Sequence, residues 1–371
     1  MSEYELYVQR VAANGALGLR STLREPELAP ELVERYGEEP LCEGLRGLRD
    51  LMARLYSEMG AHPREFGIPL VPDEKVTDTP SRRKVRGPFE APLKLLYVLG
   101  VTGTLRGSGR APSLVASVAG ASDALKRMGA KDLPAAARAL AQVGFELDRR
   151  PADEGLGEEL VASADRLGYV PMALKAFVDV CRLWERGKLK VPQMPHVFLL
   201  ADFRILRQTD SRARLPRLTL EDALPYVPAN QVGDLLDLVQ HMKSMGYRAE
   251  MGRANLLDGE FHGVYVDPKH GWRLFGFTAC RGWLNLRLTL ADAGRIMPHI
   301  DECPAPLRRE ILRQRCGKCG GTGCGKEVPV EVDGEKYDVC HFGLFGIGTW
   351  QTSDIPHLKR LLTIQAGFQA G

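Results

Sequence analysis

The run Trp283-Leu284-Asn285-Leu286-Arg287-Leu288-Thr289-Leu290 carries a leucine at every second position. Successive side chains of a β-strand point to opposite faces of a sheet, so this alternation predicts a half-buried strand. The leucines then face a core, and Trp283, Asn285 and Arg287 share the other face. One apolar and one polar face are typical of an antiparallel sheet.

The segments around this strand extend the pattern. Residues 261–266 and 272–277 flank the loop Asp267-Pro268-Lys269-His270-Gly271, and this arrangement predicts a β-hairpin. Helical spacing of apolar residues follows at 290–299, at 306–314 and from Asp354 onward. We therefore expect residues 231–371 to form an α+β domain, with an antiparallel sheet and covering helices.

The preceding part of the chain is different. Residues 1–75 have helical spacing of apolar residues and predict a helical N-terminal region, whereas residues 76–230 predict a mixed α/β middle region. The polar, proline-containing segment 72–88 predicts a linker or a long surface loop. Segments 133–147 and 235–250 both predict a helix that ends at glycine and leads into a strand. Either an internal duplication or the general frequency of glycine after helices explains this similarity.

Composition and charge exclude several classes of protein. The 371 residues carry a formal net charge of only +3, which by itself does not indicate nucleic-acid binding. The first residues show no basic and apolar secretory signal, and the apolar run 93–101 is about half the length that spans a bilayer. We expect a cytoplasmic protein with no membrane partner, in which cysteines bind metal rather than form disulfides.

A cysteine cluster follows the predicted sheet, with the sequence Arg315-Cys316-Gly317-Lys318-Cys319-Gly320-Gly321-Thr322-Gly323-Cys324-Gly325-Lys326. Together with Cys340 it supplies four thiolates, the donor set that a tetrahedral zinc site takes, and the first pair forms a C-x2-C knuckle. A site with four protein ligands is closed and structural, which predicts a small zinc-ribbon-like appendix. Two further residues are alternative zinc ligands, namely His341 in place of Cys340, and Cys303. An iron–sulfur cluster, a redox pair or unligated thiols are the alternatives.

Two resemblances concern this region. Residues 316–323 locally resemble one unit of the C-x-x-C-x-G-x-G repeat in the zinc domain of DnaJ-type chaperones, which implies a zinc knuckle. Residues 258–371 resemble the end of an uncharacterised family of bacterial proteins. In that family a cysteine cluster precedes an aspartate-glycine hairpin, a Tyr-x-x-Cys motif and a terminal helix. The corresponding elements here are Asp333-Gly334, Tyr337 to Cys340, and the helix from Asp354.

Other segments are weaker candidates for function. The glycine-rich segment 100–109 follows an apolar run, but it lacks both G-x-G-x-x-G and the lysine-bearing P-loop, so we interpret it as a flexible strand-to-helix connection. Basic residues cluster at 81–86, 204–217 and 308–318. They favour either contacts with phosphates or, next to the cysteines, neutralisation of a zinc-thiolate site with a net charge of about −2.

These patterns favour a non-catalytic binding or regulatory protein with a structural zinc site. Aromatic, amide and cationic groups in a row, as at Trp283, Asn285 and Arg287, are typical of a small-ligand pocket. The alternative for this face is a second core under covering helices. A nucleic-acid-associated zinc-knuckle protein is the second hypothesis for the whole chain, and an enzyme of unrecognised type is the third, because no catalytic motif is present.

Overall fold

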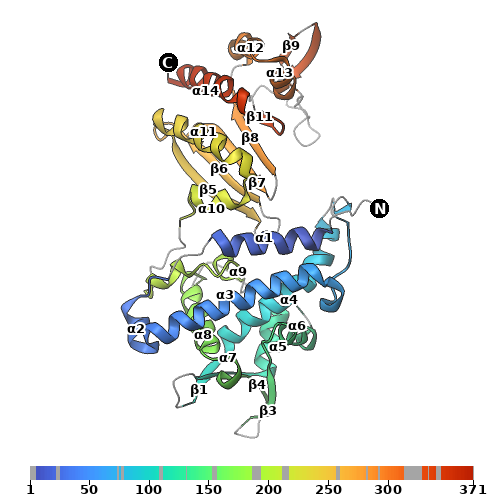
Figure 1. Ribbon diagram of the computed structural model, residues 1–371, viewed down its shortest axis with the longest axis vertical. Coiled ribbons are helices and arrows are strands. Elements are labelled where there is room, and N and C mark those ends of the chain that lie inside the picture. The colour runs from blue at the N-terminus through green and yellow to red at the C-terminus, as the bar shows by residue number, and fades with distance from the viewer. Residues whose placement is uncertain are drawn as a thin grey trace. The chain divides into compact units, whose positions relative to one another are not determined.

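The fold was determined as a computed structural model, which is mixed helix and sheet and so confirms the α+β class. It describes residues 6–21, 26–72, 75–76, 79–107, 112–130, 132–152, 157–185, 194–210, 217–255, 260–280, 283–290, 293–312, 328–332, 334–339 and 344–370. The chain forms two compact units, one built mainly from Met1–Arg217 and the other from Leu218–Asn255 and Gly259–Gly371 (Figure 1). The predicted regions 1–75 and 76–230 thus fall largely within the first unit.

Unit 1 is a helical assembly with one small sheet. Its elements are α1 (Tyr7–Ser21), α2 (Pro30–Tyr36), α3 (Glu38–Ala61), the 3-10 turn η1 (Pro63–Phe66), α4 (Thr79–Thr102), β1 (Thr104–Arg106), β2 (Ser113–Ser117), α5 (Val118–Arg127), α6 (Leu133–Gln142), β3 (Asp148–Pro151), β4 (Glu158–Ala162), α7 (Ala164–Leu167), α8 (Val170–Glu185), α9 (His196–Leu199) and η3 (Phe203–Arg207). The helices predicted for residues 1–75 are confirmed.

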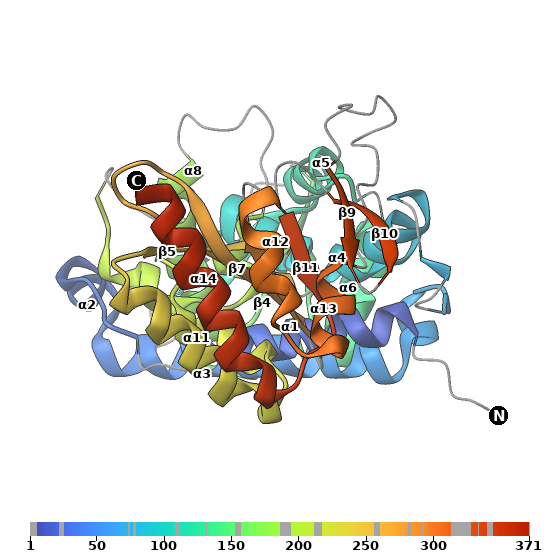
Figure 2. The ribbon, with the colours of Figure 1, turned by 90° about the horizontal axis from the view of Figure 1, so that it is seen from above.

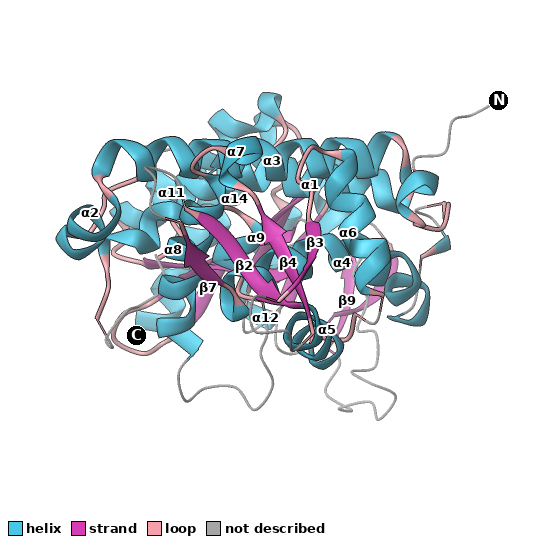
Figure 3. Ribbon diagram, turned by 90° about the horizontal axis from the view of Figure 1, so that it is seen from below, coloured by secondary structure: helices cyan, strands magenta, loops and turns pink. Residues whose placement is uncertain are grey.

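The core of unit 1 lies between its long helices. Helix α8 packs on both α3 and α4, and α1 packs on α3. The four-stranded sheet has the order β1-β2-β4-β3, is antiparallel throughout, and contacts α4, α5 and α8 (Figure 3). Glycines permit two of the closest helix contacts. A Cβ built on Gly44 of α3 would lie 2.5 Å from the carbonyl oxygen of Tyr169, and one on Gly100 of α4 would lie 2.5 Å from Cγ2 of Val178.

The prediction of a loop at 72–88 is wrong for its second half. Helix α4 starts at Thr79 and continues through Pro88 and Pro92. A proline inside a helix removes one hydrogen bond and costs about 3 kcal/mol. Buried Phe89, Leu93 and Leu96 on the same helix offset that cost by packing into the core of unit 1.

Unit 2 is an antiparallel sheet with a helical layer. Its elements are α10 (Leu220–Ala223), η4 (Leu224–Tyr226), η5 (Ala229–Gln231), α11 (Val232–Ser244), β5 (Arg248–Asn255), β6 (Glu260–Val266), β7 (Arg273–Cys280), β8 (Trp283–Thr289), α12 (Ala293–Asp301), α13 (Ala305–Leu312), β9 (Val328–Val332), β10 (Glu335–Val339), β11 (Leu344–Ile347), η7 (Thr352–Asp354) and α14 (Ile355–Ala370). Five strands pair in the order β11-β8-β7-β6-β5, and β9 and β10 form a separate ribbon.

The predicted hairpin and the alternating strand are both confirmed. Strands β6 and β7 pair as expected, and Leu284, Leu286 and Leu288 of β8 are buried. These leucines oppose Ala279, Phe277 and Phe275 of β7, so one face of the sheet is a continuous apolar surface. Helices α11 and α14 lie side by side, with α12 next to α14 (Figure 2). Helix α11 is joined to η7 by Asp234 with Thr352, and to α14 by Asp237 with Lys359 and by His241 with Thr363.

Both helix-glycine-strand segments exist as predicted. Helix α6 is followed by Gly144 and helix α11 by Gly246, at φ angles of 86° and 84°, which glycine adopts without steric cost. The strands that follow, β3 and β5, are each at the edge of their own sheet. An internal duplication stays a prediction. Within the described ranges, every helix is too short or too polar to cross a lipid bilayer.

Candidate functional site

The proposed zinc ligands Cys316, Cys319, Cys324 and Cys340, and the alternative ligand His341, lie outside the described residues. Among the residues that the structure does describe, no cluster of three or more histidine, cysteine or acidic side chains is arranged to hold a metal ion. The zinc site therefore stays a prediction.

A two-stranded ribbon follows the cysteine cluster in the sequence. Strands β9 and β10 pair with Val328 opposite Val339, and Gly334 takes up the turn at the other end with a φ of 78°. The hairpin expected from the aspartate-glycine pair is thus present. Residue 327 and residue 340 are covalently attached to Val328 and Val339, so the chain enters and leaves the ribbon at the same end.

The alternative ligand Cys303 is part of a packed interior. Its side chain is 5 % exposed, and its Sγ lies 3.7 Å from the carbonyl oxygen of His299, to which the thiol donates. Burial raises the pKa of the Cys303 thiol to about 11, which opposes formation of a thiolate. The structure gives Cys303 a packing role.

The three residues of the predicted ligand face lie where the alternation puts them. Trp283 is 43 % exposed and Arg287 is also exposed, whereas Asn285 between them is half-buried. Arg287 makes no ion pair with any residue in the described ranges. The Oδ1 atom of Asn285 is buried and has no hydrogen-bond partner there.

The polar face continues across the sheet. Asn285 is paired with Thr278 of β7, and Thr278 with His262 of β6. The Nδ1 atom of His262 and the Oγ1 atom of Thr278 are 3.0 Å apart, so these two side chains are hydrogen-bonded. A row of polar groups therefore crosses three strands at the level of Asn285.

Several arginines of the basic segments have structural partners. Arg204 binds the buried Asp202 through two hydrogen bonds, from Nε to Oδ1 at 2.8 Å and from Nη2 to Oδ2 at 2.7 Å. Arg308 donates to the carbonyl oxygen of Asp301 at the end of α12. On α4, Arg82, Arg83 and Lys84 are exposed. The basic segments thus mix structural and solvent-exposed charges.

The glycine-rich segment 100–109 is not a strand-to-helix connection. The apolar run before it is the last part of helix α4, and β1 begins at Thr104. Gly103 ends the helix, with its N–H donating to the carbonyl oxygen of Leu99. A helix C-terminus carries a partial negative charge, so this end of α4 does not favour a phosphate.

Shifted pKa values do not converge on a cleft in the described part of the chain. Burial raises the pKa of the side chains of Tyr36, Tyr247, Tyr265 and Cys303. The carboxyl pKa of Asp267 is lowered by its hydrogen bond to His270, and that of Glu302 by Arg360. Catalytic sites usually group such residues, whereas here Glu302 and Cys303 are sequence neighbours, Tyr247 is influenced by Asp267, and Tyr36 belongs to the other unit.

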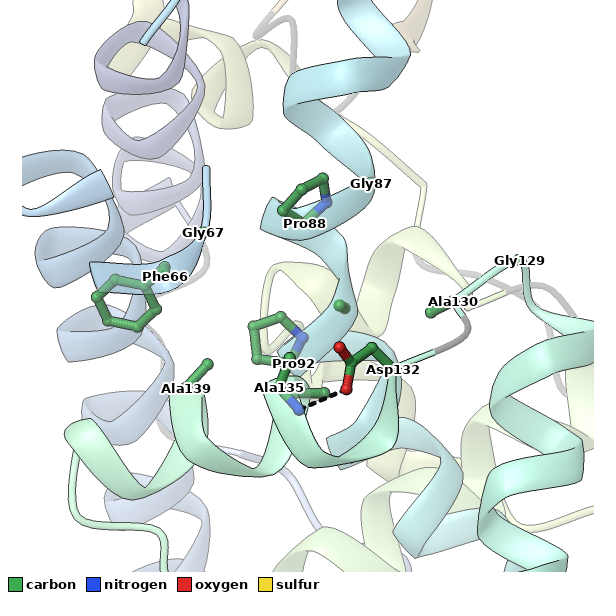
Figure 4. Close-up of a pocket in the computed structure, with 12 residues that line it drawn as sticks. Phe66, Gly67, Gly87, Pro88, Pro92, Gly129, Ala130, Asp132, Ala135 and Ala139 are labelled. Atoms are coloured by element: carbon green, nitrogen blue, oxygen red, sulfur yellow. Dashed lines mark hydrogen bonds between the residues drawn. The ribbon is translucent and has the colours of Figure 1, made fainter. Parts of the chain in front are cut away.

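A pocket that the sequence did not indicate lies in unit 1. It encloses about 370 Å³ between α4, α6 and the turn after η1 (Figure 4). Helix α4 contributes Gly87, Pro88, Ala91 and Pro92. The other walls are formed by Phe66, Gly67, Gly129, Ala130, Asp132, Ala135, Ala136 and Ala139.

The pocket owes its shape to small residues. Positions 132, 135, 136 and 139 share one face of α6, at helical spacing, and three of them are alanine. Figure 4 shows the rings of Pro88 and Pro92 on the side of α4 that faces Phe66 and Ala139. In the sequence, the only sign of this pocket was the presence of small residues and prolines in two distant segments. These segments come together because of the way α4 and α6 pack.

No protein-family model, no curated protein and no solved structure matches this chain.

Proposed function

We propose that the chain is a non-catalytic binding protein whose ligand face is the polar face of β8, in a unit closed by a structural zinc ion. The observation that carries the proposal is Arg287, which is exposed and unpaired among the described residues, on the same face as an exposed tryptophan. If covering helices had buried this face in a second core, the charge of Arg287 would have required an acidic partner.

The spacing along β8 defines the ligand. Trp283 and Arg287 are four residues apart on one strand, which corresponds to about 13 Å at roughly 3.3 Å per residue. Asn285 lies midway, and its buried Oδ1 atom needs a donor. A molecule with a planar group at one end, hydroxyl donors in the middle and an anion at the other end satisfies all three side chains. A nucleoside monophosphate has this order of groups.

The zinc part of the proposal is supported by the register of the β9–β10 ribbon. Because Val328 and Val339 are paired, the segment that contains Cys316, Cys319 and Cys324 joins the ribbon at the end from which Cys340 follows. Cys340 is one residue, about 3.8 Å between Cα atoms, beyond Val339. Ligands brought to one end of a short ribbon are the arrangement that a zinc ribbon uses. Cys303 is buried and donates to the carbonyl oxygen of His299, which favours the other four cysteines, with His341 as the alternative to Cys340.

Calorimetric titration with adenosine 5′-monophosphate tests the ligand face. Replacing Arg287 by alanine removes a charged hydrogen bond worth about 1.5–3 kcal/mol, so affinity should fall roughly 10- to 150-fold. Trp283→Ala should also weaken binding, because stacking of a base contributes about 1–3 kcal/mol. Arg273→Ala, which removes an exposed arginine at the start of β7, is the matched control and should bind normally. No binding of the nucleotide, or equal binding by Arg287→Ala and the wild type, would refute this ligand.

The alternative is a nucleic-acid-associated protein that uses the zinc knuckle and the basic segment 308–318, and the dependence of binding on polymer length distinguishes the two hypotheses. A short single-stranded oligoadenylate should bind no more tightly per site than the mononucleotide if the face takes a small ligand. Much tighter binding that weakens steeply with added salt would instead identify a nucleic-acid surface, since neutralised phosphates release counterions.

A further inference from the structure

We infer that the pocket between α4 and α6 binds a small apolar molecule that carries a protonated amine. This site lies in unit 1, so it neither depends on the ligand face of β8 nor shares residues with it. Its volume of about 370 Å³ is more than twice the roughly 150 Å³ that holds a benzene-sized molecule.

The walls favour an apolar body. Apart from one carboxylate, the lining side chains are alanine, proline and phenylalanine, and the remaining positions are glycine. A protein pocket of this kind gains most from excluding water around hydrocarbon, and it uses few polar groups to orient the ligand.

The polar groups at this site accept hydrogen bonds. Pro88 and Pro92 have no N–H, so the carbonyl oxygens of Lys84 and Pro88 lack the donor four residues on that a regular helix supplies. The carbonyl of residue i and the side chain of residue i+4 lie on the same face of a helix, which puts the Pro88 carbonyl on the pocket side of α4. A ligand that donates hydrogen bonds is therefore preferred over one that accepts them.

Asp132 adds a negative charge at the edge of the pocket. Its Oδ1 atom accepts the N–H of Ala135 at 2.8 Å and so caps the N-terminus of α6. The other oxygen, Oδ2, has no hydrogen bond to a described residue, and Figure 4 shows it directed into the space between α6 and α4. Carbonyl and carboxylate oxygens together select an ammonium group.

The space is preserved where a side chain would fit. Gly87 lies inside α4, and a Cβ built on it meets no atom within 4 Å other than those of its chain neighbours. Apart from the following Pro88, whose ring disfavours a side chain on the residue before it in a helix, no neighbour requires glycine at this position. The absence of a side chain at Gly87 leaves space for a ligand on this side of the pocket.

Three probes of matched shape test the inference by calorimetric titration: 4-phenylbutylamine, 4-phenylbutanol and 4-phenylbutyrate. The amine should bind, the alcohol should bind at least tenfold more weakly, and the acid should give no measurable binding. The acid is a stringent control, because exposed Lys84, one turn before Pro88 on the same face of α4, attracts a carboxylate rather than an amine. Equal or tighter binding of the acid, or no binding of the amine, overturns the proposal.

Variants then locate the binding site. Asp132→Asn keeps an N-cap side chain and removes only the charge, so affinity for the amine should fall at least fivefold while the melting temperature stays close to the wild type. Ala135→Phe fills the pocket and should abolish binding. Ala141→Phe adds the same ring at an exposed position of α6 outside the pocket and should leave binding unchanged. Unchanged affinity in Asp132→Asn refutes the role of the carboxylate, even if Ala135→Phe does not fold.

Discussion

Two glycines of the same helix should respond differently to replacement by alanine. Gly100 lies where α4 crosses α8, and its Cβ would be 2.5 Å from Cγ2 and 2.6 Å from Cβ of Val178. Carbon atoms pack at about 3.5–4.0 Å, so the two helices would have to separate by roughly 1 Å. Rotation of Val178 cannot relieve the contact, since its Cβ is fixed to the backbone of α8.

The magnitude follows from two opposing terms. Alanine is favoured over glycine in a helix interior by about 0.8–1 kcal/mol, whereas overpacking a well-packed core costs about 1–3 kcal/mol and occasionally more. Gly100→Ala should therefore lower the free energy of unfolding by up to about 2 kcal/mol. Gly87→Ala meets no atom within 4 Å apart from its chain neighbours, so only the ring of Pro88 opposes the gain of about 0.8–1 kcal/mol, and this change should cost less than Gly100→Ala.

Urea denaturation followed by circular dichroism measures both changes. A double-mutant cycle with Val178→Ala identifies the contact, because removing the valine methyl groups should make Gly100→Ala less costly than it is in the wild type. The reasoning is refuted if Gly100→Ala destabilises the protein no more than Gly87→Ala does, or if the Val178 background leaves the effect unchanged.

Three further predictions concern other parts of the chain. The purified protein should contain about one zinc ion per chain by elemental analysis, and Cys319→Ala should destabilise unit 2 more than unit 1, because metal binding contributes to folding; metal-free protein after purification without chelators would contradict the zinc site. Cys303 should resist iodoacetamide at neutral pH in the native state, because a pKa of about 11 leaves about a hundredfold less thiolate than an ordinary thiol has. Labelling followed by mass spectrometry measures this, and labelling as fast as in the unfolded protein would contradict the burial of Cys303. Asn14 of α1 is 1 % exposed, and neither polar atom of its side chain has a hydrogen-bond partner among the described residues. Asn14→Leu should therefore raise the free energy of unfolding by about 1–3 kcal/mol. A lower thermal midpoint would instead reveal a partner for the amide.

The sheet of unit 2 could be predicted because period-two alternation is a local property of the chain. The leucines of β8 and the loop between β6 and β7 identify their own strands without knowledge of the partners. Strand β11 is different: it is short, and it becomes a strand by pairing with β8, from which the whole of α12, α13 and the ribbon separate it. No local pattern reveals such a long-range pairing.

Helix α4 shows where local rules fail. The polar, proline-containing sequence of residues 72–88 predicted a loop, but burial of one apolar face of α4 in unit 1 outweighs both prolines of the helix. For the same reason the pocket was missed, since its walls come from α4, α6 and the turn at Gly67. The shared face of Trp283, Asn285 and Arg287 could be predicted from the sequence, because these residues belong to a single strand.

The pairing of β11 with β8 affects how the chain folds while it is being synthesised. Strand β8 cannot gain its second neighbour until Phe345 and Ile347 emerge, and buried Leu358, Leu361 and Leu362 of α14 emerge later still. At roughly 5–20 residues per second, the time between synthesis of β8 and synthesis of these leucines is about 4–15 s. During that interval unit 1 has all of its elements, whereas the nascent sheet of unit 2 has an unpaired edge at β8 and lacks α14, and such edges are sites of aggregation. Ribosome-bound chains that stop before β11 should therefore contain a protease-resistant unit 1 and a protease-sensitive unit 2.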